Sequence, residues 1–255
     1  MAPPVHALYL SPHLDDAVLS CGGQLHALAR SGRHALVATV MAGDAPEDLS
    51  PLGAELHRTW APHLGGAGVM DGRRREDAEA CAALGVEHEH MDVSDALYRR
   101  DPSTGAPLYP TLGSLFARPR PEDDALVDEV AERLAALPAA ERVVAPLGAG
   151  RHVDHLLVRR AAERVFGRGR LELYEDYPYA RERWVLAKAL GLPWRWRSRL
   201  LTLDEAALAA KCRAIACYLS QLVTAFADRD DMERQVRAFA ARVGGERLWR
   251  HRSSP

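Results

Sequence analysis

Two short polar motifs contain the residue types that could do chemistry in this 255-residue chain. Both combine histidine with aspartate: His13, Asp15 and Asp16 in the first, and His152, Asp154 and His155 in the second. Each follows a short apolar run of the kind that forms a buried strand. Either motif alone could simply begin a helix, where free backbone N–H groups favour acidic residues. Two such motifs together indicate a site assembled from distant parts of the chain.

Two histidines and a carboxylate with an open coordination position form the ligand set of a catalytic zinc site. A water in the open position ionises near neutral pH, and a carboxylate that does not bind the metal can accept its proton during attack on a carbonyl. Asp15 suits this role, because consecutive side chains at a strand-to-helix corner diverge and leave Asp16 free to bind the metal. A protonated His152 could stabilise the resulting oxyanion, and Asp154 could fix the tautomer of an imidazole.

The two motifs resemble those of the PIG-L family, also called LmbE-like deacetylases, which are commonly written (A/S)HPDDE and HxDH. Two further segments are similar to family patterns: Arg73 and Glu76 followed by a Leu-Gly pair, and the stretch from Lys211 to Gln221. The resemblance spans residues 9 to about 221. It implies a Rossmann-like enzyme that cleaves N-acetyl groups from glucosamine derivatives with zinc, or with ferrous iron as the alternative metal.

The resemblance also implies a role for each matching residue. The family pattern assigns the metal ligands to His13, Asp16 and His155, the general base to Asp15, the transition-state histidine to His152 with Asp154 behind it, and the substrate-binding arginine to Arg73.

Three positions depart from the family pattern. Leu14 replaces the usual proline and Ala17 the usual glutamate; neither position supplies a metal ligand or the base. Gly150 lies where some members have an active-site tyrosine, so that contribution is either missing or supplied from another loop. These departures are expected to alter the surroundings of the site and the choice of substrate more than the reaction itself.

Apolar runs alternate with helical patterns along the first two thirds of the chain. Strands are predicted near residues 6–13, 34–43, 88–93, 142–147 and 170–176, with helices near 17–30, 72–84, 121–136 and 153–166 between them. This alternation predicts a doubly wound, mostly parallel α/β sheet with C-terminal helical additions near 180–190, 204–220 and 231–243. Ligands of such sheets bind beyond the carboxyl ends of the strands, where both polar motifs would lie.

Irregular segments interrupt this pattern. The Pro/Gly-rich stretches 43–70 and 99–122 are expected to be loops over the site. The aromatic and basic run 192–197 is interpreted as a partly buried surface loop, although it could stack on a sugar. The tyrosine-rich segment 174–179 could line a sugar pocket or pack on the core.

Length and composition limit the other possibilities. A chain of this size with 47% hydrophobic residues fits one domain over residues 1–255. A formal net charge of -2 gives no electrostatic reason to bind nucleic acid or an anionic membrane. The longest apolar stretch is far shorter than a membrane-spanning helix, so a cytoplasmic protein is expected. The oligomeric state remains open.

Three functions fit these observations. A deacetylase acting on a small amino sugar is the main prediction. An amidase that cleaves a larger amide, such as a thiol conjugate, would use the same chemistry with a deeper pocket. A sugar-binding protein without catalytic activity is disfavoured, because it would need neither a metal triad nor a spare carboxylate, and fold class alone does not separate the three.

Overall fold

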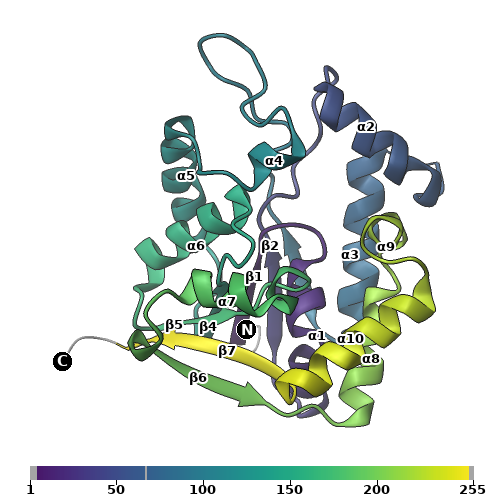
Figure 1. Cartoon of the computed structure of the whole chain (residues 1–255), viewed down its shortest axis with the longest axis vertical. Helices are drawn as coiled ribbons and strands as arrows, with labels where there is room; N and C mark the ends of the chain where they lie inside the picture. Colours follow the sequence, from purple (N-terminus) through teal and green to yellow (C-terminus); the bar gives the residue numbers. More distant parts are fainter. Residues whose placement is uncertain (1–4, 67, 253–255) are drawn as a thin grey trace.

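A seven-stranded sheet forms the centre of the computed structural model, which describes residues 5–66 and 68–252 (Figure 1). Its strand order is β3-β2-β1-β4-β5-β7-β6. The strands are β1 (Val5–Ser11), β2 (Ala35–Thr39), β3 (Glu87–His90), β4 (Ala140–Pro146), β5 (Leu171–Tyr174), β6 (Trp196–Leu201) and β7 (Glu246–His251). The first five are parallel, whereas β7 pairs antiparallel with both β5 and β6.

Helices cover both faces of the sheet. The α-helices among the described residues are α1 (Asp16–Arg30), α2 (Pro51–Trp60), α3 (Val69–Leu84), α4 (Leu112–Leu115), α5 (Asp124–Ala135), α6 (Val153–Phe166), α7 (Arg183–Leu190), α8 (Glu205–Ile215), α9 (Leu219–Ala225) and α10 (Arg229–Val243). Helices α1, α3 and α8 pack together on one side, and α5 packs with α6 on the other.

The sequence of β1 explains why the sheet has two cores. Successive side chains of a strand point to opposite faces. Ala7 and Tyr9 accordingly belong to the core beneath α1, α3 and α8, while Leu8 and Leu10 belong to the core beneath α5 and α6. Because both faces are covered, a central strand must be apolar throughout. The Rossmann-like, mostly parallel sheet predicted from the sequence is confirmed.

The antiparallel edge of the sheet was not predicted. The run 192–197, interpreted above as a surface loop, ends in the first two residues of β6. Strand β6 reads WRSRLL and is mostly exposed, so it lacks the apolar run that identifies the buried parallel strands. The predicted helix 204–220 is also two helices, α8 and α9, and the two Pro/Gly-rich segments contain α2 and α4.

Within the described residues no single helix is both long and apolar enough to cross a membrane. The consecutive helices α8 and α9 meet that test only when taken together, and they are bent by 99°.

Candidate metal centre and active site

Both polar motifs lie at the carboxyl ends of neighbouring strands. The first occupies the turn from β1 into α1, and the second occupies the turn from β4 into α6. Ser11 shapes the first turn: its hydroxyl donates to the carbonyl of His13 at 2.6 Å and accepts from the backbone N–H of Ala17 at 3.0 Å. The Asp16 carboxylate accepts from the backbone N–H of His13 at 2.9 Å, which holds these two residues together.

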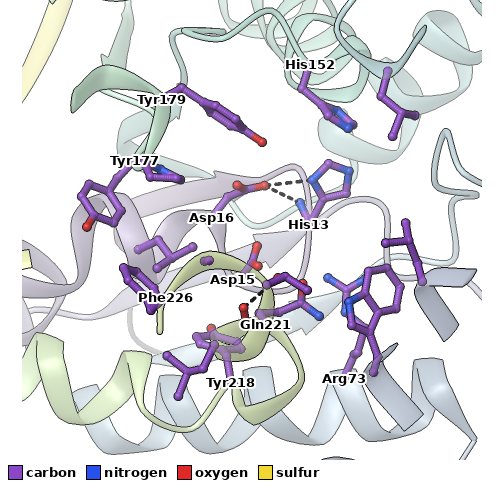
Figure 2. A pocket seen from close by; sticks show the side chains of 18 of the residues that line it. His13, Asp15, Asp16, Arg73, His152, Tyr177, Tyr179, Tyr218, Gln221 and Phe226 are labelled. Atoms are coloured by element: carbon purple, nitrogen blue, oxygen red, sulfur yellow. Dashed lines mark hydrogen bonds and ion pairs between the residues drawn. The ribbon is translucent and has the colours of Figure 1, made fainter. Parts of the chain in front are cut away.

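The structure brings His13, Asp16 and His155 together, and Figure 2 shows the contact between His13 and Asp16. Oδ2 of Asp16 lies 3.1 Å from Nδ1 of His13 and 3.2 Å from Nε2 of His155. Ligand atoms at about 2.1 Å from a tetrahedral zinc ion are separated by roughly 3.4 Å, so these spacings fit one shared divalent ion. Nitrogens of His13, His152 and His155 also lie within 4.8 Å of one another, which places His152 beside the same position.

Carboxylates hold the far nitrogen of both imidazoles. Nδ1 of His155 is 2.7 Å from Asp176, and Nε2 of His13 is 3.0 Å from Asp154. Pairing of a ligating histidine with a carboxylate is typical of metal sites, because it fixes the ring and raises its basicity. Burial lowers the pKa of each imidazole, but the nearby carboxylates outweigh it and raise the pKa of His155 to about 10. The negative charge of the carboxylates around these two imidazoles favours binding of a cation between them.

Asp154 differs from the expectation that it stands behind His152. Its carboxylate bonds to His13, to the backbone N–H of Ala96 at 2.9 Å and to Arg99 at 2.6 Å. It does fix an imidazole, as its chemistry suggested, but that imidazole belongs to His13. The ion pair with Arg99, on the segment that follows β3, draws the carboxylate away from His152.

A second group of possible metal ligands consists of His13, Asp95 and Asp154. Asp95 was not singled out from the sequence; its Oδ2 lies 3.6 Å from Nε2 of His13. The buried guanidinium of Arg99 pairs with Asp154 and also with Asp123, so it offsets part of the negative charge in this group. Asp16 contacts two imidazoles and no guanidinium among the described residues, which makes the position between His13, Asp16 and His155 the better candidate for a cation.

Asp15 lies beside the same position and lines the pocket. Burial and then the charge of Asp16 raise the pKa of Asp15 to about 7, although Arg73 and His13 oppose the rise. A carboxylate with this pKa can take up and release a proton near neutral pH.

His152 is the N-cap of α6, and its Nδ1 accepts the backbone N–H of Asp154 at 3.3 Å. Burial and then the charge of His13 lower the pKa of His152 to about 3, so the ring is neutral at pH 7. This differs from the protonated histidine expected above. Since Nδ1 is an acceptor, the proton of the neutral ring resides on Nε2, which can still donate a hydrogen bond.

Arg73 lines the pocket from α3 and is only 4% exposed. Its guanidinium lies over the Trp60 ring, 4.6 Å from the centroid. Arg73 has no ion-pair or hydrogen-bond partner among residues 5–66 and 68–252, and its Nε is buried without one. A buried guanidinium with free donors at a pocket wall is suited to bind polar groups of a ligand.

Tyr179 supplies an aromatic hydroxyl from a loop after β5. A side-chain carbon at Gly150 would lie 2.5 Å from the Tyr179 ring, so the ring occupies space that only glycine leaves open. Figure 2 shows the Tyr179 hydroxyl pointing toward the space between Asp16 and His152. The tyrosine-rich segment 174–179, for which the sequence left a sugar pocket or the core open, places Tyr177 and Tyr179 on the pocket lining, and Tyr179 fills the space above Gly150.

These residues surround one cavity of about 350 Å³. Its floor contains His13, Asp15, Asp16, Asp95 and His152, and its walls are mainly apolar, with side chains from α2, α4, α8 and α9. The segments 43–70 and 99–122 thus contribute to the walls through Leu56, Trp60, Leu112, Leu115 and Phe116, as expected of loops over the site.

Comparison with known proteins agrees with this site. The sequence model of the PIG-L family, described as "GlcNAc-PI de-N-acetylase", matches residues 8–166, which contain both polar motifs. The chain belongs to the PIG-L family. Within that match lie all the residues that the motifs predicted for the metal and the base.

Among PIG-L relatives, a 2'-N-acetylparomamine deacetylase of Niallia circulans is 30% identical over 68% of this chain and 66% of its own length. The 2'-N-acetylparomamine deacetylase of Streptomyces fradiae is 34% identical over 69% of this chain and 58% of its own length. The chain thus spans a little under two thirds of these curated relatives.

A solved structure resembles nearly the whole chain. The zinc-inhibited form of teicoplanin deacetylase has a TM-score of 0.81 and 30% identity, covering 98% of this chain and 100% of that one. The likeness extends beyond the family match into the C-terminal region that contains α8, α9 and α10.

Proposed function

We propose that this protein is a metal-dependent hydrolase that removes the N-acetyl group from a small amino-sugar derivative. The observation that supports this most directly is the convergence of His13, Asp16 and His155 beside a carboxylate, Asp15, that is not needed as a ligand. The named relatives and the solved neighbour described above are all deacetylases.

The donor set fits a divalent ion held by His13, Asp16 and His155. Two imidazoles and one carboxylate suit zinc or ferrous iron, and leave a position open. Such an ion would supply Lewis acidity for the amide carbonyl and the attacking water. Asp154 and Asp176 would keep the two imidazoles oriented, each through its hydrogen bond to the outer ring nitrogen.

Asp15 is proposed to accept the proton of the attacking water and to pass it to the leaving amine. Its raised pKa suits both steps, because the carboxylate is basic enough to take the proton and acidic enough to return it. Activity is expected to fall as the pH drops through the pKa of Asp15, since only the deprotonated carboxylate can accept a proton.

His152 and Tyr179 are proposed to donate hydrogen bonds to the oxyanion. The neutral ring of His152 offers Nε2–H, and the hydroxyl of Tyr179 points into the same space. Arg73 is proposed to bind a hydroxyl or carbonyl oxygen of the substrate through its unpartnered donors. Donors held in advance where charge develops contribute more than donors that must reorient.

The cavity volume favours a small substrate over a large conjugate. About 350 Å³ is near the lower end of the range for ligand sites. This fits an acetylated sugar ring better than the bulky amide that the amidase alternative would require.

The test is an acetate-release assay over a panel of acetylated amino sugars, including antibiotic and thiol precursors. The enzyme is first stripped of metal with a chelator and then reloaded with a measured amount of zinc or ferrous iron. Acetate release that depends on added metal is expected. Because the solved neighbour is described as zinc-inhibited, the zinc titration should extend beyond one equivalent. Absence of acetate from every substrate at every metal ratio would refute the proposal.

A further inference from the structure

A second cleft lies beside the main cavity and shares one wall with it. Phe116 lines both. The second cleft measures about 290 Å³ and lies between the loop after β4, helix α6 and helix α7. Its lining also includes Arg151, Trp184 and Lys188.

The partition between the two cavities is thin. The Phe116 ring lies 5.3 Å from the His152 ring and 5.6 Å from the Tyr179 ring, centroid to centroid. Phe116 is 37% exposed, so its edge is open to solvent rather than sealed in the core. A substrate bound at the main site therefore needs to extend by only about one ring to enter the second cleft.

The chemistry of the second cleft is aromatic and cationic. Trp184 and Lys188 are four residues apart on α7, so they lie on the same face of the helix. The Trp184 side chain is 66% exposed, an unusual position for a large apolar ring. The side chains of Arg151 and Lys188 make no ion pair or hydrogen bond within the part of the chain that the structure describes.

Arg151 also has an uncommon backbone conformation. Its φ of 67° lies in the left-handed region, which non-glycine residues seldom adopt. Arg151 directly precedes His152 in the sequence. The same loop therefore places Arg151 in the second cleft and His152 in the main cavity. The floor between these cations is apolar, with Leu147, Leu156 and Val185.

We propose that the second cleft binds the part of the substrate beyond the acetylated sugar, and that this part is an aromatic ring bearing a carboxylate. The ring would stack on Trp184 and the apolar floor, and the carboxylate would pair with Lys188 and Arg151. This rests on the proposed function, because it extends the same substrate. Because Arg151 and Lys188 are both cations, the second cleft would repel a substrate with polycationic substituents.

The experiment compares N-acetylglucosamine, phenyl N-acetyl-β-glucosaminide and its 4-carboxyphenyl analogue by acetate release and by calorimetric binding. The wild-type protein is expected to favour the carboxyphenyl over the phenyl compound by about fivefold in kcat/KM, as expected of one or two exposed ion pairs. The substitutions Lys188→Ala and Arg151→Gly should remove that preference. Arg151→Gly suits the positive φ, so misfolding is not expected to obscure its result.

Trp184→Ala should raise KM for both aryl compounds and leave N-acetylglucosamine unchanged. Matched controls are Trp194→Ala, which removes an indole that is 67% exposed but lies outside the cleft, and Arg183→Ala, on the same helix but outside the lining. Neither control should alter the preference.

Two results would overturn the proposal for the second cleft and leave the deacetylase assignment intact. One is equal use of the phenyl and carboxyphenyl compounds, and the other is a preference that survives Lys188→Ala and Arg151→Gly. If none of these three compounds releases acetate, the deacetylase assignment is decided by the wider substrate panel described above, and calorimetry decides the proposal for the second cleft. Tighter binding of the carboxyphenyl compound that depends on Trp184 and Lys188 supports that proposal, and equal binding overturns it.

Discussion

The floor and the walls of the main cavity are built differently. The floor is lined by His13, Asp15, Asp16 and His152, which follow the carboxyl ends of β1 and β4, and the buried residues Asp154, His155 and Asp176 bond to these residues or to one another. Its imidazoles at 13 and 155 each bond to a buried carboxylate. The walls come from α2, α3, α4, α8, α9 and the segment 177–179, and they include Leu112 and Phe116, whose side chains are exposed. The floor is thus constrained for chemistry, whereas the walls can vary with the substrate.

His155→Ala should have the largest effect, because it removes a proposed metal ligand and leaves Asp16 and Asp176 without their shared partner. We expect loss of bound metal together with loss of acetate release. Metal content and activity would be measured side by side, with His63→Ala, an exposed histidine outside the site, as the control. Retention of stoichiometric metal would contradict the ligand assignment.

Asp15→Asn should separate binding of the metal from turnover. The substitution keeps the size of the side chain but removes the proton acceptor, so kcat should fall by about 10² to 10⁴ while metal content is unchanged. Full activity in this variant would mean that another group is the base.

His152→Ala should lower kcat by about 10² to 10³, as expected when one oxyanion donor is removed. KM should change little, because this donor acts mainly after the carbonyl is attacked. A larger change in KM than in kcat would instead make His152 a substrate-binding residue.

Tyr179→Phe tests the junction between floor and wall. The ring that fills the space above Gly150 is kept, and only the hydroxyl is lost. A decrease in kcat of up to about tenfold is expected, the value of one hydrogen bond. Unchanged kcat would show that Tyr179 only fills space.

Arg73→Ala should have the smallest effect on the chemical step, because Arg73 belongs to the wall. We expect KM to rise by about tenfold, with a minor change in kcat. Because the Arg73 side chain is buried and packs over Trp60, thermal unfolding of the variant should be measured beside the kinetics. Unchanged KM and kcat would exclude Arg73 from substrate binding.

Much of the floor could be predicted from local patterns. Apolar runs identified β1 and β4, and polar residues directly after them pointed to the edge where ligands of parallel sheets bind. The walls were less predictable. Helix α2 lies within a segment rich in proline and glycine, and β6 lacks an apolar run because it is an exposed edge strand.

The partners of the floor residues could not be predicted from spacing. Asp154 is two residues from His152 in sequence, yet its carboxylate bonds to His13, 141 residues away, because Arg99 holds it on that side. Asp95 likewise reaches the site from a segment with no motif of its own, whereas the tyrosine-rich segment 174–179 had suggested a pocket lining without indicating which tyrosine lies there. Side-chain direction at a turn depends on the charges and rings packed against it, and these come from other elements.

The amino-acid sequence alone indicated metal-assisted hydrolysis and left deacetylase and larger-amide amidase open, because two histidines and two adjacent aspartates after buried strands restrict the chemistry to few choices. Only the tertiary structure decided which carboxylate orients which imidazole, that burial lowers the pKa of His152, and that an aromatic and cationic cleft adjoins the site. The physical reason is that residue types set the possible interactions, while burial and distance, which arise only on folding, select among them.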